Sequence, residues 1–286
     1  MHSTSFVRQS FGSEFRALLA IAKKEWRIFR RYPAWVVAFI IWPVLFPFGY
    51  IFTARALSGP DGSTLPAFQH LAGTTDYIGF IVVGSTLWMW INITLWDVGF
   101  QLRNEQLRGT LESNWLCPVW RISIMLGSSL TKLGTALLLL AITALEFRLF
   151  FGVQLLRGNL ALLLLLLLLT IPSIYGLGVA FGSLVLRVKE ANAMVFLVRG
   201  IFMVFCGITY PLEVLPDWMK RVAALLPLTY AIRGMRTVIL TDAPFAKVLP
   251  DVQMLAIFAV AMPVLGSIAF YAIERRARRI GDLGHY

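Results

Sequence analysis

The chain has 286 residues, of which 58% are hydrophobic and 14% are charged. Soluble domains carry roughly 25% charged residues, so this composition excludes an ordinary soluble domain and predicts a membrane protein. The net charge of +11 comes from short basic clusters between apolar runs, which suits contact with anionic membrane lipids and argues against nucleic-acid binding.

The first expected element is an amphipathic helix over residues 11–31. Apolar residues such as Leu18, Leu19 and Trp26 recur at helical spacing, and basic residues such as Lys23 and Arg27 lie between them. A basic amphipathic helix that carries a tryptophan lies in the plane of the membrane interface. The alternative is an ordinary basic flank of the first membrane span.

Six apolar windows are long enough to cross a bilayer, which requires about 20 predominantly apolar residues. They cover residues 34–53, 77–96, 122–145, 160–186, 193–208 and 252–273. The fifth window is short unless the segment after it also enters the membrane. An unbroken leucine run at 162–169 predicts a surface that faces lipid. These windows predict an all-α integral membrane protein, with residues 1–286 forming one membrane domain.

The basic residues near the ends of the windows predict the orientation. Sixteen Lys and Arg residues lie before the first window, after the second, after the fourth and after the last, against eight on the other side. Loops rich in Lys and Arg stay in the cytoplasm. We therefore expect a multi-pass protein of the plasma (inner) membrane of a prokaryote, with both termini cytoplasmic.

The segment 101–121, QLRNEQLRGTLESNWLCPVWR, is charged and follows the second window on the cytoplasmic side. Gly109 interrupts it, Thr110 can cap a short helix, and Pro118 ends that helix. The pattern predicts a short cytoplasmic helix whose exposed carboxylates, Glu105 and Glu112, are available to a partner. The alternative is a solvated loop between spans.

The segment 209–240 is too polar to cross a bilayer and too apolar for a solvated loop. Three prolines break it into short pieces: Pro211, Pro216 and Pro227. One helix is expected to begin at Asp217 and Trp218, and a second is expected to run from Tyr230 to about Leu240 with Thr229 as its cap. This pattern predicts an external re-entrant hairpin, because broken helices at membrane depth need shelter by protein or water.

Two basic residues of the hairpin, Arg233 and Arg236, are three apart and are expected on one helix face. They either reach outer lipid head groups or guide an anionic part of a substrate, and head groups are the favoured interpretation.

Amphipathic side chains suggest a substrate path through the second and fifth windows. The candidates are Trp88, Trp90, Asn92, Phe202, Phe205 and Tyr210. Such residues suit contact with a lipid, a drug or a sugar, and they equally suit an aromatic belt at the membrane interface.

The cytoplasmic segment reads E-x-x-x-G-T-L-E-x-x-x-x-x-P-x-x-R, and the hairpin reads P-L-x-x-L-P-x-W followed by L-P-L-T-Y and an arginine. Together with the order of the windows, these motifs resemble the membrane permease subunits of type-2 (exporter-type) ATP-binding-cassette (ABC) transporters. The resemblance implies contact with the ATPase subunit through Glu105, Arg108, Gly109, Thr110, Leu111, Glu112, Pro118 and Arg121. It also implies an external gate that includes Pro211, Pro216, Trp218, Pro227, Tyr230, Arg233 and Arg236.

The same resemblance implies a permease dimer, homomeric or with a sister permease. The sequence has no G-x-x-x-x-G-K-[ST] phosphate loop, so we expect no cofactor in this chain, with ATP and magnesium bound by a separate ATPase subunit. The expected function is ATP-driven export of a lipid-like, drug-like or other amphipathic substrate. Polysaccharide or lipid-linked polysaccharide export is the alternative within the family.

An ion-coupled secondary transporter is the alternative of another class, because it needs ionisable groups within its spans. Lys132 and Arg199 are the candidates, but both are close enough to a cytoplasmic span end for their side chains to reach the interface, and neither has an evident acidic partner. An enzyme is disfavoured. The histidines lie outside the apolar windows, and no carboxylate dyad or metal motif is present.

Overall fold

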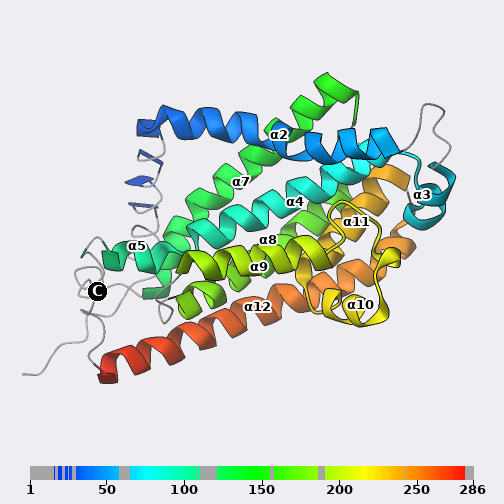
Figure 1. The fold of residues 1–286 in the computed structure, drawn as a ribbon. Coiled ribbons are helices and arrows are strands. Elements are labelled where there is room, and N and C mark those ends of the chain that lie inside the picture. Colours follow the sequence, from blue (N-terminus) through cyan, green and yellow to red (C-terminus); the bar gives the residue numbers. More distant parts are fainter. Residues whose placement is uncertain are drawn as a thin grey trace, which may run out of the picture.

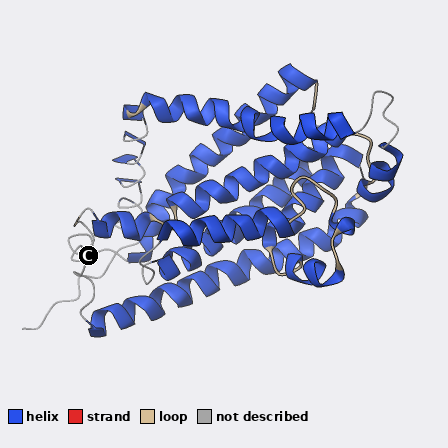
Figure 2. Ribbon diagram, in the orientation of Figure 1, coloured by secondary structure: helices blue, strands red, loops and turns tan. Residues whose placement is uncertain are grey.

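The computed structural model describes residues 16, 19–20, 23–24, 26–27, 30–57, 65–107, 109, 121–154, 158–185, 191–241 and 243–280. Within these residues the secondary structure is helical and contains no strand (Figure 2). The amphipathic helix expected at 11–31 lies largely outside them, although residues such as Arg16, Lys24 and Trp26 are helical.

The helices follow the apolar windows. Their bounds are α2 Pro33–Leu57, α3 Leu65–Ala72, α4 Tyr77–Asp97, α5 Gln101–Leu107, α7 Arg121–Phe151, α8 Leu160–Val185, α9 Ala191–Phe205, the 3-10 turn η1 Leu212–Val214, α10 Asp217–Ala223, α11 Pro227–Thr241 and α12 Phe245–Ile280. In this part of the chain, α2, α4, α7, α8 and α12 are long and apolar enough to cross a membrane. The number of candidate spans rises to six if the bent pair α10 and α11 counts as one span. The prediction of an all-α membrane protein is confirmed.

The long helices form a bundle with two distinct ends (Figure 1). The start of α2, the short helix α5 and the end of α12 lie at one end, called here the α5 end. The short helices α3 and α10 and the turn between α11 and α12 lie at the other, called here the α3 end. This arrangement follows from the chain reversing direction after each long helix.

Helix α4 is the centre of the bundle. Of its apolar window 83% is buried, compared with 18% for α2 and 11% for α12. Helix α4 is packed against α2, α7, α8, α9 and α11, so its side chains meet protein on every side. In contrast, α2 and α12 present most of their apolar surface outward, as lipid-facing helices do.

Close packing of α8 against α12 and α4 depends on glycine. A side chain at Gly176 would overlap the backbone of Pro263, and one at Gly182 would press on the backbone of Gly99. Small residues let membrane helices approach closely. The G-x-x-x-G of α8, Gly178 and Gly182, therefore packs within the chain against α4.

The leucine run does not form one lipid-facing surface, so that prediction is wrong. Leu162, Leu163 and Leu166 are buried in the core, whereas Leu164 and Leu168 are exposed. Eight consecutive helical residues point in all directions around the axis, because a helix turns every 3.6 residues. A run of one residue type therefore covers the buried face as well as the outer face.

The fifth window forms a short helix. Helix α9 has 15 residues, which corresponds to about 22 Å at 1.5 Å per residue, less than the roughly 30 Å of a bilayer core. After it, the carbonyl of Ile208 lies against Gly84. Gly84 is inside α4, which begins at Tyr77, and thus about 10 Å from the start of that helix. Helix α9 therefore ends within the bundle and short of its α3 end.

Candidate functional site

The break between α10 and α11 forms a bend of 94°. Helix α10 begins at Asp217 after Pro216, as the sequence predicts. Helix α11 begins at Pro227, earlier than expected, so Thr229 lies inside the helix and does not cap it. Instead the Thr229 hydroxyl donates to the carbonyl of Ala223 at 2.8 Å, and the Tyr230 hydroxyl donates to that of Ala224 at 2.9 Å. Two side chains of α11 thus satisfy carbonyls at the end of α10.

Arg236 connects α11 to α4 and to the end of α9. It is 8% exposed, and its guanidinium donates to the backbone carbonyls of Phe80 at 3.0 Å, Gly207 at 2.7 Å and Ile208 at 2.5 Å. It also lies 3.4 Å from the centre of the Phe80 ring. Three backbone acceptors and an aromatic face compensate in part for the burial of this charge. The interpretation of Arg236 as a head-group anchor is therefore wrong.

Arg233 takes a different partner, although it is three residues from Arg236. Its Nη2 lies 2.6 Å from the carboxylate of Asp251 in α12, and its Nε donates to the same oxygen at 2.8 Å. The Asp251 side chain is 5% exposed and that of Arg233 is 48% exposed. This ion pair fixes the start of α12 to the middle of α11.

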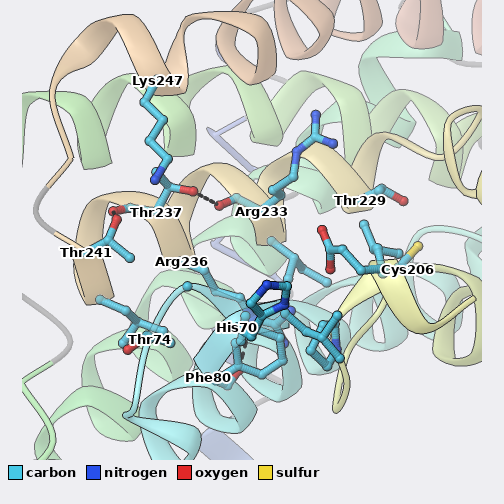
Figure 3. Close-up of a pocket in the computed structure, with 18 residues that line it drawn as sticks. His70, Thr74, Phe80, Cys206, Thr229, Arg233, Arg236, Thr237, Thr241 and Lys247 are labelled. Carbon is cyan, nitrogen blue, oxygen red and sulfur yellow. Dashed lines mark hydrogen bonds between the residues drawn. The ribbon is translucent and has the colours of Figure 1, made fainter. Parts of the chain in front are cut away.

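A pocket of about 280 Å³ opens beside these residues at the α3 end (Figure 3). Its floor is buried and includes Phe80, Cys206, Thr229 and Arg236. Its rim is exposed and polar, with the charged residues Glu213 from η1, Arg233 from α11 and Lys247 from α12, and with His70 from α3. A smaller cavity adjoins it and shares Leu212, Glu213, Thr229 and Arg233 with it. The pocket therefore collects polar groups from four elements that are distant in sequence.

Contacts of Tyr210 and Trp218 with the end of α9 hold the segment between α9 and α10 in place. The Tyr210 hydroxyl donates to the carbonyl of Val204, and Phe205 packs edge-on against Trp218 with 6.0 Å between ring centres. Burial, and secondarily the neighbouring Cys206, raises the pKa of Tyr210 above its ordinary value. A tyrosine hydroxyl is already protonated at neutral pH, so the raised pKa only extends the pH range over which it donates.

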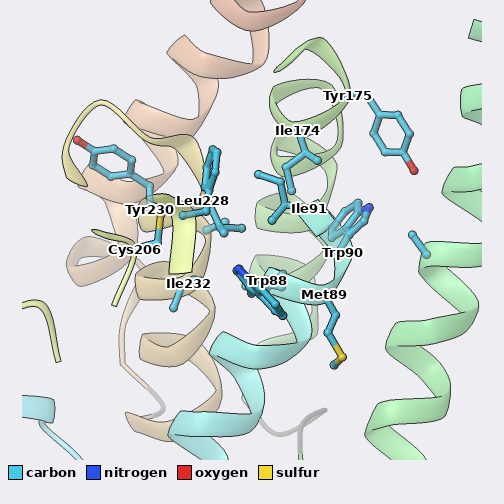
Figure 4. Packing of buried hydrophobic residues seen from close by; sticks show 14 of the residues in the cluster. Trp88, Met89, Trp90, Ile91, Ile174, Tyr175, Cys206, Leu228, Tyr230 and Ile232 are labelled. Carbon is cyan, nitrogen blue, oxygen red and sulfur yellow. The ribbon is translucent and has the colours of Figure 1, made fainter. Parts of the chain in front are cut away.

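The other aromatic candidates for a substrate path are packed inside the chain (Figure 4). Trp88 stacks on Phe46 with 4.6 Å between ring centres, and its indole N–H donates to the carbonyl of Arg199. Trp90 and Phe202 are buried as well. Asn92 is partly buried, and its Oδ1 accepts no hydrogen bond within the described residues. The pockets lined by His70 and Arg236, by Pro263 and Tyr271, and by Lys220 and Tyr230 do not include these four predicted residues.

At the α5 end, the segment 101–121 is described only in part. Helix α5 ends at Leu107, and Gly109 follows with a φ of 68°, a backbone conformation that often ends a helix. The Glu105 side chain is 10% exposed and lies 3.5 Å from the ammonium of Lys24. Glu105 is therefore not the exposed carboxylate that the sequence suggested. Arg121 begins α7, whereas Arg108, Thr110, Leu111, Glu112 and Pro118 lie outside the described residues.

Lys132 has an acidic partner that the sequence did not reveal. Its ammonium lies 3.2 Å from the carboxylate of Asp97, the last residue of α4. Arg199 lies over the rings of Trp88 and Phe196, at 5.2 Å from each centre. Lys132 thus joins α7 to α4, and Arg199 joins α9 to α4.

The predicted site residues did not include the pocket residues His70, Glu213 and Lys247, nor Asp251, which pairs with Arg233 beside the pocket. Helix α3, which carries His70, was also not expected. Asp251 did give a signal, because an ionisable residue at the edge of an apolar window usually has a partner. The partner itself, Arg233, is in another helix and cannot be identified from spacing.

Comparison with known protein families gives one match. The family model described as "ABC-2 family transporter protein" matches residues 56–268, which is most of the chain. A search of curated proteins gives no match. The matched region includes every helix from α3 to α11 and most of α12. The resemblance to the membrane component of an ABC transporter is therefore confirmed.

Proposed function

Because the chain belongs to the ABC-2 family of transporter proteins, we propose that it is the membrane subunit of an ATP-driven exporter. A multi-pass permease of this family works with an ATP-binding subunit. In our proposal that subunit is a separate polypeptide that binds ATP and magnesium, and this chain assembles with a second permease copy, identical or related. Both termini are cytoplasmic, and the α3 end is external.

The observation that carries this proposal is the family match over residues 56–268, in a chain without a phosphate-binding loop of its own. In our proposal, chemical energy comes from a docked partner. The α5 end is the proposed docking surface, formed by α5 and the segment up to Arg121. Its charged and apolar residues are suited to docking in a cleft of the ATPase. This contact would transmit a rigid-body motion of the ATPase to the helices.

The proposed substrate is a lipid-like or other amphipathic small molecule. Sugar conduits present aromatic faces to the substrate, whereas Trp88, Trp90 and Phe202 are at most 2% exposed within a single chain. These aromatic residues could line a path only after the core of α4 had opened. A lipid-like substrate can instead travel along the outward apolar faces of helices such as α2 and α12, which favours it over a polysaccharide.

Co-expression with the cognate ATP-binding subunit tests the proposal. We expect the two chains to purify together, and the complex in liposomes to hydrolyse ATP and to move a short-chain fluorescent phospholipid across the bilayer. A variant of the ATP-binding subunit that cannot hydrolyse ATP is the control, and it should form the complex without transport. Movement driven by an ion gradient in the absence of ATP would contradict the proposal and favour a secondary transporter.

A further inference from the structure

The pocket at the α3 end has an excess of positive charge. Three basic side chains line it, Arg233, Arg236 and Lys247, against one carboxylate, Glu213. Asp251 neutralises Arg233 by direct contact. Glu213 can offset the charge of a second basic group. One positive charge therefore remains in excess around the pocket.

The two remaining cations differ in depth. Arg236 forms the floor, and its hydrogen bonds within the described residues all go to backbone carbonyls. Carbonyl dipoles solvate a guanidinium without cancelling its charge, and Glu213 is the carboxylate that interacts electrostatically with Arg236. The charge left in excess is therefore that of Lys247. Lys247 is exposed on the rim with no ion pair to a described carboxylate. His70 faces the same pocket from α3.

We propose that this pocket binds the phosphate-bearing head group of an anionic amphipath. Lys247 and His70 contact the phosphate at the rim, and Arg236 supplies a fixed positive field from the floor. The proposal rests on the proposed function for one point, that the α3 end lies at the outer leaflet, where head groups occur. Guanidinium and ammonium groups are the usual protein partners of phosphate.

The size of the pocket limits the ligand. A volume of about 280 Å³ is just below the usual range for ligand pockets, roughly 300–1,000 Å³. The pocket can hold a head group but not acyl chains, which must stay in the bilayer. The ligand is thus held at its charged end only, beside the bent pair α10 and α11, whose Thr229 lies in the pocket floor.

Native mass spectrometry of the purified full-length chain tests the binding site directly. The probes are dioleoylphosphatidylglycerol, which is anionic, and dioleoylphosphatidylcholine, which is zwitterionic. The key variants are Lys247→Gln and His70→Gln. Arg221→Gln is the matched control, because Arg221 is an exposed cation on α10 that lines neither this pocket nor the cavity that adjoins it.

We expect Lys247→Gln to weaken phosphatidylglycerol binding about fivefold, which is the effect of one basic residue at a lipid surface. His70→Gln should weaken it less, and Arg221→Gln should leave it unchanged. An equal effect of Lys247→Gln and Arg221→Gln would overturn the proposal, since it would indicate only general charge attraction. Equal binding of the two lipids to the native chain would also overturn it.

Transport assays then identify the source of the head group. If the ligand is the exported substrate, Lys247→Gln raises the KM for transport of a fluorescent phosphatidylglycerol. If it is a resident membrane lipid, ATPase activity falls in bilayers without phosphatidylglycerol and recovers when that lipid is added, with no change in KM. Both results support an anionic head-group site. Because the binding measurement needs no ATPase subunit, failure of the exporter proposal and failure of this site are distinguishable.

Discussion

A single buried arginine holds together three segments at the α3 end. Arg236 donates to carbonyls of α4 and of the turn after α9, and these carbonyls are shielded from water by the bundle. Lysine could not replace it fully, because an ammonium group lacks the planar fork that reaches several acceptors at once.

We predict that Arg236→Leu lowers stability by at least about 2 kcal/mol, because each buried carbonyl left without a donor costs about 1–3 kcal/mol. The melting temperature of the purified protein in detergent measures this change. Arg236→Lys should lie between Arg236→Leu and the native protein, and the exposed Arg221→Leu should melt like the native protein. Equal melting temperatures for Arg236→Leu and Arg221→Leu would contradict the role described for Arg236.

Gly84 provides a second test at the residue scale. A methyl group at this position would overlap the carbonyl of Ile208 and the guanidinium of Arg236. We predict that Gly84→Ala forces the end of α9 away from α4, with a cost of about 1–3 kcal/mol, as for other overpacked positions. Gly134→Ala and Gly200→Ala are matched controls, because nothing lies within 4 Å of a methyl group there. Their melting temperatures should equal or exceed the native value, since alanine favours helix.

At the scale of elements, the bend between α10 and α11 has two physical causes. Pro227 cannot continue a preceding helix, and the hydroxyls of Thr229 and Tyr230 bond to carbonyls at the end of α10. Pro227 is the first residue of α11, a position at which proline fits a helix well. Its removal alone therefore leaves both hydroxyl contacts in place.

We predict that the double variant Thr229→Val and Tyr230→Phe loosens the bend more than Pro227→Ala does. Each lost hydrogen bond is worth about 0.5–1.5 kcal/mol. Hydrogen exchange of the backbone amides in α10 reports the loosening, and it should rise more in the double variant. Greater exchange in Pro227→Ala would indicate that the proline, and not the hydroxyl contacts, holds the bend.

Helix α5, the proposed docking element, offers a prediction with an internal control. The Lys24–Glu105 pair has one half-exposed member, so its contribution to stability is small. Reversal of Glu105 to Lys, however, places two like charges together and should move α5. We expect Glu105→Lys to reduce ATPase activity of the assembled complex, and the additional change Lys24→Glu to restore part of it. No recovery in the double variant would indicate that Glu105 acts through contact with the ATPase itself.

The sequence predicted elements better than contacts. The apolar windows and the helix start after Pro216 follow from local properties, namely side-chain hydrophobicity and the missing N–H of proline. The partners of Arg233 and Arg236 do not, because Asp251 and Phe80 come from other helices and only the packed bundle brings them close. The prediction that the leucine run faces lipid was wrong for a related reason. Its residues have the same hydrophobicity, so only the neighbours of α8 decide which of them are buried.

At the scale of the whole molecule, the two ends of the bundle have different chemistry. The α5 end contains the charged helix α5 and the basic residues that follow Ile273 in α12. The basic residues just before α2, such as Lys24 and Arg30, lie there as well. The α3 end holds short helices and the pocket. In the positive-inside rule, basic residues flanking the spans keep their loops on the cytoplasmic side. In our proposal, the same orientation places an ATPase at the α5 end and the proposed head-group pocket at the outer leaflet.

Cysteine labelling checks this orientation. In a background without Cys117 and Cys206, we expect Gln69→Cys on α3 to react with a membrane-impermeant maleimide in intact cells. Asn104→Cys on α5 and Ser3→Cys near the N-terminus should react only after the membrane is made permeable. Gln69 and Asn104 are both exposed, so a difference in labelling reports the side of the membrane and not burial. Labelling of Gln69→Cys and Asn104→Cys from the same side would be incompatible with the bundle crossing the bilayer between α3 and α5. The reverse pattern would place the pocket in the cytoplasm and would contradict the proposed orientation.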